Sequence, residues 1–567
     1  MRDLILRFRP FFVYAALFSF AINMLMLAPA AYMLQVFDRV ITGRSEETLA
    51  MLTLVVVPAL LVMTLIEGLR ARLLAACGGA MDRQLGPRVL DGVLAHTARL
   101  SGAEYVNGLR DVNTLRGFLT GAGIFSLFDA PWLPLFLMLI FLFHPLLGAV
   151  ALTGSLVMIV IAIFNERLTR EPLEKVQAGT RRASRYIDAS ARNAEVVSAL
   201  GMLPAVTRRW AAINDTVLRQ QAQAGALGGT LSGLTRFTRQ AIQIAMVGAG
   251  AWLVVDQHVT PGVMLASTLI LGRALAPMEA LVANWRNLVE ARAAWGRLAQ
   301  LLASNPPAVP GTELPAPQGE VAVERVVFGL RGAEKPIIRG VSFVLPAGES
   351  LGIIGPSAAG KSTLARLILG VWKPNSGAVR LDGADVAAWP REHLGPYVGY
   401  LPQDVELFAG TVAENIARLG EMDSPAVIRA AQRAHVHELI LRLPRGYDTE
   451  VGDSGTALSP GQRQRIGLAR AVYGEPRLVV LDEPNANLDH EGEEALVHTL
   501  RELKQQSVTV VVIAHRPSLL GSVDKLLVLR DGAVEVFGPR AEVLARVTRP
   551  APAVVPPAVA PPARGVA

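Results

Sequence analysis

Long stretches without ionisable residues constrain this chain more than any other feature. Residues 10–34 contain no charged side chain over 25 positions. At 1.5 Å of rise per residue, one such helix crosses a hydrocarbon core of about 30 Å. Comparable apolar runs follow, and the longest is divided by His144-Pro145. They predict six membrane-spanning helices: residues 10–34, 49–66, the two parts of 118–164, 241–255 and 261–282.

Basic residues predict how these helices are oriented. Arginines are frequent in the first ten residues and in the long segments between spans two and three and between spans four and five. The connections at His144 and at residues 256–260 contain neither Lys nor Arg. The positive-inside rule therefore places both termini and both long loops in the cytoplasm. The first span lacks an obvious cleavage site, so we expect it to be retained.

Composition excludes several function classes. Hydrophobic residues make up 51% of the chain, charged residues only 18%, and the mean hydropathy is +0.37. The surplus of 55 Lys and Arg over 48 Asp and Glu gives a net charge of +7, too dilute for a nucleic-acid-binding protein. The single cysteine, Cys77, excludes an intrachain disulfide framework and a Cys-rich metal site.

The second half of the chain is soluble in character. A Pro-rich stretch at residues 304–318 predicts a linker after a membrane domain at 1–303. Residues 319–545 alternate short β-branched runs with helical patterns, which predicts an α/β domain with a largely parallel sheet. The Pro- and Ala-rich tail at 546–567 is expected to be disordered.

A phosphate-binding loop lies near the start of this α/β domain. The segment "GPSAAGKS" fits G-x-x-x-x-G-K-[ST], follows the strand "SLGII" and precedes a helix. Its backbone N–H groups are predicted to hold phosphates, Lys361 to neutralise them and Ser362 to bind Mg²⁺. Ala358 occupies a position where a positive φ would cost about 1 kcal/mol. The predicted nucleotide-binding residues here are Gly355, Pro356, Ser357, Ala358, Ala359, Gly360, Lys361, Ser362 and Thr363.

Two adjacent acids end a buried strand about 120 residues later. In "LVVLDEP", Asp482 is predicted to hold Mg²⁺ and Glu483 to polarise the attacking water. Taken alone, this pair is more simply a turn at the end of a strand. The phosphate loop upstream favours the catalytic interpretation.

The segment "LSPGQRQRIGLARAV" predicts a helix start without a phosphate loop of its own. Ser459 is the expected N-cap and Pro460 the first helical residue, so free N–H groups face an anion. Here the chain resembles the ATP-binding cassette (ABC) superfamily, whose "LSGGQ" signature caps a nucleotide held by a partner subunit. Ser459, Gly461 and Gln462 match that signature, and Pro460 replaces its first Gly.

Further positions follow from this resemblance. Gln403 in "YLPQD" resembles the Q-loop residue that reaches Mg²⁺, and His515 in "VIAHRP" the switch histidine near the γ phosphate. Asp489 in "NANLD" resembles the D-loop residue at the dimer interface, and residues 449–455 an exporter X-loop with Asp453 where Glu is common. Phe328 is the aromatic nearest the position, occupied by Leu330, where relatives carry the residue that stacks on adenine.

Six spans ahead of one cassette resemble a half-transporter. The resemblance implies a type I ABC exporter fold fused to an α/β P-loop nucleotide-binding domain, working as a homodimer in the lipid bilayer. It would bind two ATP molecules with Mg²⁺ and hydrolyse both through Glu483 and His515. Coupling helices are expected within residues 104–118 and 195–210.

Finer matches indicate the cargo class. "YMLQVFDRVITGRSEETL", "FDAPWLPLF", "RALAPMEA" and "GYLPQDVELFAGTVAENIAR" resemble the PrtD-like permease/ATPases of type I secretion systems, which export proteases, lipases, haem-binding and S-layer proteins. Such proteins sit in the bacterial inner membrane with a periplasmic membrane-fusion adaptor and a TolC-like outer-membrane channel. They move unfolded polypeptides with C-terminal signals. Toxin exporters carry an extra domain before the first span, which is expected to be absent here.

Two alternatives remain open on the same fold. One is a flippase of lipids or small amphiphiles, and the other is an ATP-gated channel or regulator, which Glu483 and His515 disfavour. Arg273 and Asp129 interrupt apolar stretches. Either they face a translocation path, or they lie close to the cytoplasmic surface and are solvated there.

Overall fold

The chain divides into two compact units. The computed structural model describes residues 2–99, 108–304, 314–330, 335–514 and 516–547. Unit 1 comprises Met1–Pro306 and unit 2 comprises Pro307–Ala567. The described part of unit 1 is helical, whereas unit 2 contains both β-sheets. The predicted linker and tail fall largely outside the described residues and stay predictions.

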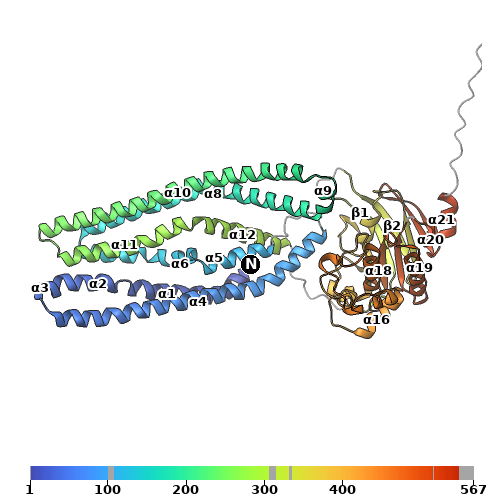
Figure 1. Ribbon diagram of the computed structural model, residues 1–567, viewed down its shortest axis with the longest axis horizontal. Helices are drawn as coiled ribbons and strands as arrows, with labels where there is room; N and C mark the ends of the chain where they lie inside the picture. Colours follow the sequence, from blue (N-terminus) through green and yellow to red (C-terminus); the bar gives the residue numbers. More distant parts are fainter. Residues whose placement is uncertain (1, 100–107, 305–313, 331–334, 515, 548–567) are drawn as a thin grey trace, which may run out of the picture. The chain divides into compact units, whose positions relative to one another are not determined.

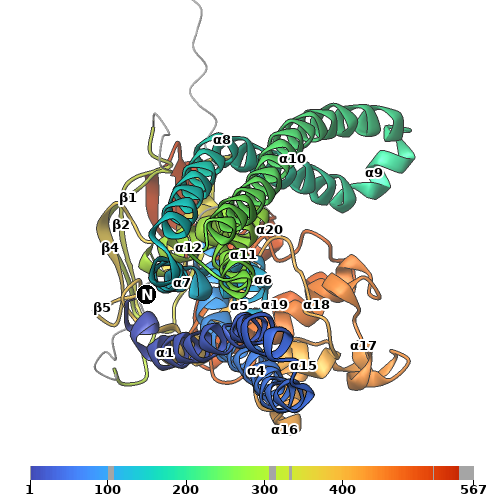
Figure 2. The same cartoon turned by 90° about the vertical axis from the view of Figure 1, so that its left-hand side faces the viewer.

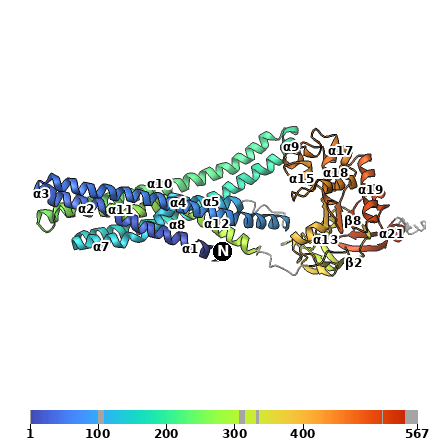
Figure 3. The same cartoon turned by 90° about the horizontal axis from the view of Figure 1, so that it is seen from below.

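Long helices make up unit 1. Helices α8 and α10 run side by side and are joined at α9 (Figure 1). Their α9 ends extend away from the other helices of the unit (Figure 3). The elements are α1 (Arg2–Leu25), α2 (Ala28–Gln35), the π-helical η1 (Val36–Val40), α3 (Ile41–Gly43), α4 (Glu46–Arg99), α5 (Gly108–Thr120), α6 (Ala122–Asp129), the 3-10 helix η2 (Ala130–Trp132), α7 (Leu133–Phe143), α8 (Pro145–Arg192), α9 (Ala194–Ala199), α10 (Leu203–Val255), α11 (Pro261–Ala283) and α12 (Trp285–Ser304).

Five of the described helical segments are long and apolar enough to cross a membrane. The remaining predicted span, residues 241–255, is the C-terminal end of α10 and packs along α11. This apolar stretch is only 15 residues long and follows Arg236 and Arg239, so α10 is not apolar enough over the length needed to cross a membrane. The span at residues 241–255 therefore stays a prediction. The five segments are Leu6–Gly43, Glu46–Ala98, Ala122–Phe143, Pro145–Arg192 and Pro261–Ala283.

The predicted break at His144-Pro145 is a one-residue connection between α7 and α8. His144 is extended, and its Nδ1 accepts a hydrogen bond from the Leu146 amide at 3.1 Å, which caps α8. Gly148 lets the two helices approach, because a Cβ there would overlap the Phe141 ring. The tight turn expected from the sequence is therefore confirmed.

An acidic side chain connects the turn after α2 to the start of α11. Asp38, on η1, accepts hydrogen bonds from Thr260 Oγ1 at 2.6 Å and from the Gly262 amide at 3.0 Å. Thr260 is itself the N-cap of α11. Asp38 thus satisfies an amide of the first turn of α11 from outside the helix and places negative charge at its positive end.

Unit 2 combines two sheets. The first sheet has the order β2-β1-β4-β5 and is antiparallel; its strands lie together in Figure 2. The second has the order β10-β9-β3-β8-β7-β6 and is parallel except for β10. The strands are β1 (Val321–Phe328), β2 (Ile338–Leu345), β3 (Ser350–Ile354), β4 (Ser376–Leu381), β5 (Ala384–Asp385), β6 (Val398–Leu401), β7 (Leu478–Asp482), β8 (Thr509–Ile513), β9 (Lys525–Arg530) and β10 (Ala533–Pro539).

The central strands of the parallel sheet are buried on both faces. All five residues of β7 and of β8 are buried, as the apolar runs in the sequence predict. Their carboxyl ends meet at one edge with that of β3, where the phosphate loop begins. The helices of unit 2 are α13 (Lys361–Ile368), α14 (Arg391–Leu394), α15 (Val412–Ile416), α16 (Ser424–Arg433), α17 (His437–Leu441), α18 (Pro460–Ala471), α19 (His490–Gln505), α20 (Pro517–Leu520) and α21 (Arg540–Val547), with 3-10 turns η3 (Gly395–Tyr397), η4 (Gly446–Asp448) and η5 (Asp453–Gly455).

Candidate nucleotide-binding site

The predicted phosphate loop connects β3 to α13. Gly355 has φ +156°, and a Cβ at this position would overlap the Leu529 carbonyl oxygen. Gly360 has φ +96°, and a Cβ would lie 2.8 Å from Ile338. Both positions therefore require glycine, and the loop can close tightly at the start of α13. Residues 355–363 lie where the sequence predicts them.

Ala358 carries the strain that the sequence predicts. Its φ is +64°, in the left-handed region, where an L-residue costs about 1–2 kcal/mol. The neighbouring Ala359 is buried and has no positive φ. Its carbonyl accepts a hydrogen bond from the Gly532 amide at 3.2 Å, which anchors the loop to the β9–β10 turn.

Lys361 folds back over the loop. Its Nζ donates to the carbonyl oxygens of Gly355 at 2.9 Å and Pro356 at 3.0 Å, and the residue is only 6% exposed. Burial lowers the pKa of the ammonium group, while the nearby Glu483 and Asp482 oppose that shift. The loop thus concentrates a desolvated positive charge beside its backbone N–H groups, which is an arrangement that binds phosphate.

Ser362 and Asp482 place two oxygen atoms that could bind a metal ion close together. Ser362 Oγ donates to Asp482 Oδ1 at 3.1 Å, although 120 positions separate the residues. Burial raises the pKa of Asp482, a shift that the hydrogen bond from Ser362 partly offsets and the adjacent Glu483 increases. Mg²⁺ prefers hydroxyl and carboxylate oxygens at 2.0–2.1 Å, which places neighbouring ligands about 2.9 Å apart. The pair fits that ion, and a bound cation would also stabilise the buried carboxylate.

No group of three or more His, Cys, Asp or Glu residues suited to a metal occurs within the described ranges. A magnesium ion held by Ser362 and Asp482, with Gln403 as a further candidate ligand, would complete its coordination with nucleotide phosphates and water.

Glu483 is held in an unusual backbone conformation. Its φ is +47°, and its amide donates to the Ile513 carbonyl on β8 at 3.0 Å. Gln403, just after β6, donates through Nε2 to Glu483 Oε2 at 2.9 Å. Positive φ at a non-glycine residue is costly and clusters at functional sites. The structure thus brings Gln403 and Glu483 together beside Asp482.

The signature segment has the helix start that the sequence predicts. Ser459 is the N-cap of α18, and its Oγ accepts from the Gln462 amide at 3.3 Å while Gln462 Oε1 accepts from the Ser459 amide at 2.9 Å. Pro460 occupies the first turn, where its missing N–H costs nothing. Gly461 is required by space, because a Cβ would lie 2.9 Å from the Asn487 carbonyl.

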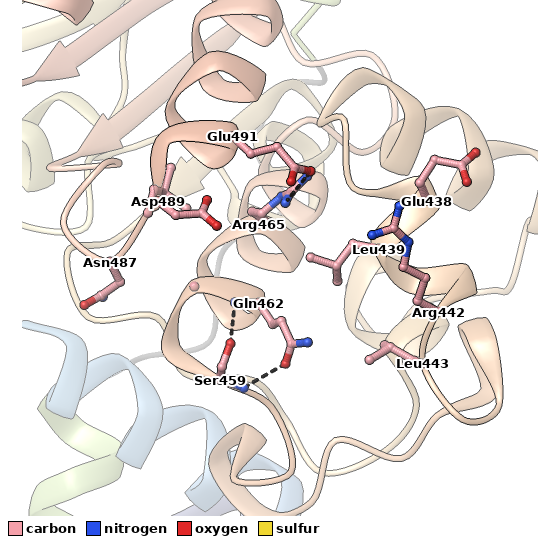
Figure 4. A pocket seen from close by; sticks show the side chains of 12 residues that line it. Glu438, Leu439, Arg442, Leu443, Ser459, Gln462, Arg465, Asn487, Asp489 and Glu491 are labelled. Carbon is pink, nitrogen blue, oxygen red and sulfur yellow. Dashed lines mark hydrogen bonds and ion pairs between the residues drawn. The ribbon is translucent and has the colours of Figure 1, made fainter.

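A pocket of about 470 Å³ opens at this helix start. Figure 4 shows Ser459 and Gln462 at one side of it, with Asp489 on the facing segment. Among the described residues that line this pocket, none belongs to the phosphate loop. Asp489 acts as the N-cap of α19, accepting from the Gly492 amide at 2.8 Å. The predicted site residues therefore form two separate groups within one chain.

Two residues that sequence reasoning missed, Gln464 and Arg465, tie these segments together. Gln464 is buried, donates to the Pro484 carbonyl at 3.0 Å and accepts from Asn487 at 3.2 Å. Arg465 donates to the His435 carbonyl at 2.7 Å and pairs with Glu491 at 3.4 Å, the ion pair drawn in Figure 4. The sequence signal for Gln464 was its position, because a polar residue two places after Gln462 falls on the buried side of α18.

The structure corrects one assignment and leaves others untested. Phe328 is 7% exposed and stacks on Trp372 with ring centroids 5.0 Å apart, so it is a core residue and is not presented to a nucleotide. Leu330 is exposed. His515 and the side chain of Asp453 lie outside the described residues.

Of the predicted coupling segments, 195–210 overlaps all but the first residue of α9 (Ala194–Ala199), and the exposed Leu200 and Leu203 follow that helix. Segment 104–118 is described only from Gly108, where α5 packs on α4 and α12.

The sequence also matches known families. The ABC transporter model matches residues 338–486, and the ABC transporter transmembrane region model matches residues 12–277. A solved structure titled "Structure of a bacterial Atm1-family ABC exporter with ATP bound" aligns with a TM-score of 0.79 and 25% identity over 95% of this chain and 96% of that one. The helical unit and the cassette with its phosphate loop and signature thus define an ABC transporter, an ATPase coupled to transport.

Relatives narrow this class. The "Type I secretion system ATP-binding protein PrsD" of Rhizobium meliloti (strain 1021) is 42% identical over 544 residues, 96% of this chain and 94% of that protein. The "Cyclolysin secretion/processing ATP-binding protein CyaB" of Bordetella pertussis is 30% identical over 93% of this chain and 75% of that protein. The chain belongs to the ABC transporter family of type I secretion systems, and is a multi-pass membrane protein.

Proposed function

We propose that two copies of this chain bind two ATP molecules and use their hydrolysis to export polypeptides across the bacterial inner membrane. The observation that carries this proposal is the division of the site into two groups. Lys361, Ser362 and Asp482 form a phosphate and magnesium site, whereas Ser459 and Gly461 present a helix start in a pocket with no phosphate loop. A second copy supplies what each group lacks.

The proposed roles follow from geometry. Backbone N–H groups of residues 355–363 and Lys361 hold the phosphates, and Ser362, Asp482 and Gln403 are the residues that would hold Mg²⁺. When bound, that ion neutralises phosphate charge. Glu483 orients and deprotonates the attacking water, with Gln403 holding its carboxylate in place. His515 lies outside the described residues, and its role beside the γ phosphate is proposed from its resemblance to the switch histidine of the family.

The names of the relatives support polypeptide cargo. They describe proteins that secrete or export toxins and serve type I secretion. On this basis the chain exports unfolded polypeptides with C-terminal signals, with a periplasmic membrane-fusion adaptor and a TolC-like outer-membrane channel. Both termini then lie in the cytoplasm. Export of lipids or small amphiphiles is the alternative.

Glu483→Gln tests the hydrolytic role. The amide cannot accept the proton of water, so turnover should fall by 100-fold or more, within the roughly 10²–10⁴-fold that a general base contributes. ATP affinity should stay within a factor of two, and ATP-bound dimers should accumulate in size-exclusion chromatography. Glu421→Gln is the matched control, because Glu421 is exposed and lies outside the site. Undiminished turnover in Glu483→Gln would exclude Glu483 as the base.

A further inference from the structure

Two acidic side chains within the helices of unit 1, Asp129 and Glu279, are held in ion pairs. Arg70 on α4 donates to Asp129 at 2.7 Å and to Ser19 on α1 at 2.6 Å, and the two charged side chains are only 8% and 18% exposed. On α11, Glu279 pairs with Arg239 of α10 at 2.9 Å. Such pairs are the usual arrangement for charges in a membrane bundle. Asp129 therefore helps to hold α4 against the neighbouring helices through its ion pair with Arg70. It is neither solvated at a surface nor free to face a translocation path.

Arg273 is the other charged residue of α11, and its surroundings differ. Its side chain is exposed, and no hydrogen bond or ion pair joins it to another of the described residues. It lies twelve positions after Pro261, about 18 Å along the helix. This depth is near the middle of a hydrocarbon core of about 30 Å, where a lipid-facing Arg costs roughly 2.5–3.5 kcal/mol. This cost disfavours a lipid-facing position for Arg273.

The exposed face of α11 is narrow. Leu269, Arg273 and Ala276 are exposed at helical spacing, while the adjacent Ile270 is 3% exposed and packs in the bundle core. Pro277 has no amide hydrogen to offer the Arg273 carbonyl, four positions earlier. The Arg273 guanidinium group and the Arg273 carbonyl oxygen therefore both need hydrogen-bond partners at the same depth along α11. Within a membrane such groups require water or protein.

We propose that Arg273 lines a water-filled path between two copies of the chain and binds carboxylate groups of the polypeptide that passes through it. This inference rests on the proposed export of polypeptides. A guanidinium group offers five donors in a planar fork that matches a carboxylate. Two copies bring two such groups to the path, so acidic segments of the cargo are retained and basic segments are repelled.

The first test measures whether water reaches this face. Cys77 is the only cysteine and is buried, so Cys77→Ala gives a background for single cysteines. The variants Leu269→Cys, Arg273→Cys and Ala276→Cys are reconstituted in zwitterionic phosphatidylcholine vesicles and treated with charged methanethiosulfonates. Ile270→Cys is the buried control on the same helix. Leu61→Cys, at a residue that is 60% exposed within the apolar run 49–66 of α4, is the control for a position expected to face lipid.

The three cysteines on the exposed face should react on the order of tenfold faster than both controls, because only a hydrated thiol ionises readily. Rates no faster than that of Leu61→Cys would place the face in lipid and overturn the proposal. Protection by a second copy, seen as an unreactive Arg273→Cys in the dimer, would also overturn it. ATP binding by each variant checks that the chain is folded.

The second test measures preference for anions. With Arg273 intact, Leu269→Cys should react faster with sulfonatoethyl than with trimethylammonioethyl methanethiosulfonate, on the order of tenfold for opposite probe charges about one helical turn away. An additional Arg273→Ala should abolish the preference, and Arg273→Lys should keep it.

A synthetic 20-residue Gly/Ser peptide with Asp at every fourth position should protect Leu269→Cys, whereas its Lys counterpart should not. Equal protection by both peptides, or no protection, would refute carboxylate binding.

These results are distinguishable from the fate of the proposed function. Reactivity and anion preference are measured without secretion. If the acidic peptide protects Leu269→Cys yet ATP does not drive a polypeptide with a C-terminal secretion signal across the vesicle membrane, the carboxylate site stands and polypeptide export fails. If export proceeds with no anion preference, the proposed function stands and the role of Arg273 is refuted.

Discussion

Replacing Ala358 by glycine should stabilise the nucleotide-binding unit. At φ +64°, the alanine costs about 1–2 kcal/mol that glycine does not. Glycine also gains freedom in the unfolded chain, which removes about 0.4–1 kcal/mol of that benefit. The net gain lies between about 0 and 1.6 kcal/mol, with a midpoint of about 0.8 kcal/mol. For a unit of this size, 1 kcal/mol shifts Tm by roughly 2–4 °C, so Ala358→Gly should raise Tm by about 1–4 °C.

The assay is calorimetry of the full chain in detergent, following the transition that ATP shifts upward. Ala359→Gly is the matched control, one position along the same loop, without positive φ and 3% exposed. It should lower Tm, because it loses a buried methyl group and adds unfolded-state entropy. If Ala358→Gly lowers Tm as much as Ala359→Gly does, the argument from backbone strain is wrong.

Three further predictions concern charged groups. Because burial raises the pKa of Asp482, protons should displace Mg²⁺ at a higher pH than for an ordinary aspartate; titrating ATP affinity with and without EDTA should show acid sensitivity mainly in the magnesium-dependent part. Arg70→Ala should destabilise the membrane unit by about 3 kcal/mol by leaving Asp129 unpaired, and adding Asp129→Asn should restore part of the loss in thermal unfolding. Burial alone would raise the pKa of Asp524, but hydrogen bonds from Lys504 and Ser350 outweigh it and lower that pKa. Asp524→Asn should therefore cost about 1 kcal/mol at neutral pH, and denaturant unfolding should show the difference vanish as pH falls through the folded-state pKa.

Local features of the site could be predicted from the sequence. The phosphate loop, the acidic end of β7 and the helix start at Ser459 each depend on a few consecutive residues. The sequence also indicated that Ala358 would be strained if its position required a positive φ, and the structure shows that it does. Apolar runs likewise predicted the buried strands and the break at His144.

Contacts between distant segments were not predictable in this way. Arg70 and Asp129 are 59 positions apart, and no periodicity relates them. The sequence alone therefore left Asp129 equivalent to Arg273, whereas the structure separates the two by their partners. The suggestion that Phe328 stacks on adenine was wrong for a related reason. Its closeness in sequence to the expected aromatic position does not reveal that it packs on Trp372.

The contact of Asp38 with the start of α11 links two turns at this end of the membrane unit: the one between α2 and α4, and the one between α10 and α11. Separating this carboxylate from Thr260 and Gly262 breaks two hydrogen bonds, which water only partly replaces, at a net cost of about 0.5–1.5 kcal/mol each. Any opening at this end must move the α1–α3 segment and the α10–α11 hairpin together, or supply that free energy first. The free energy needed to part these two turns is therefore set by the chain itself and is the same whichever molecule is transported.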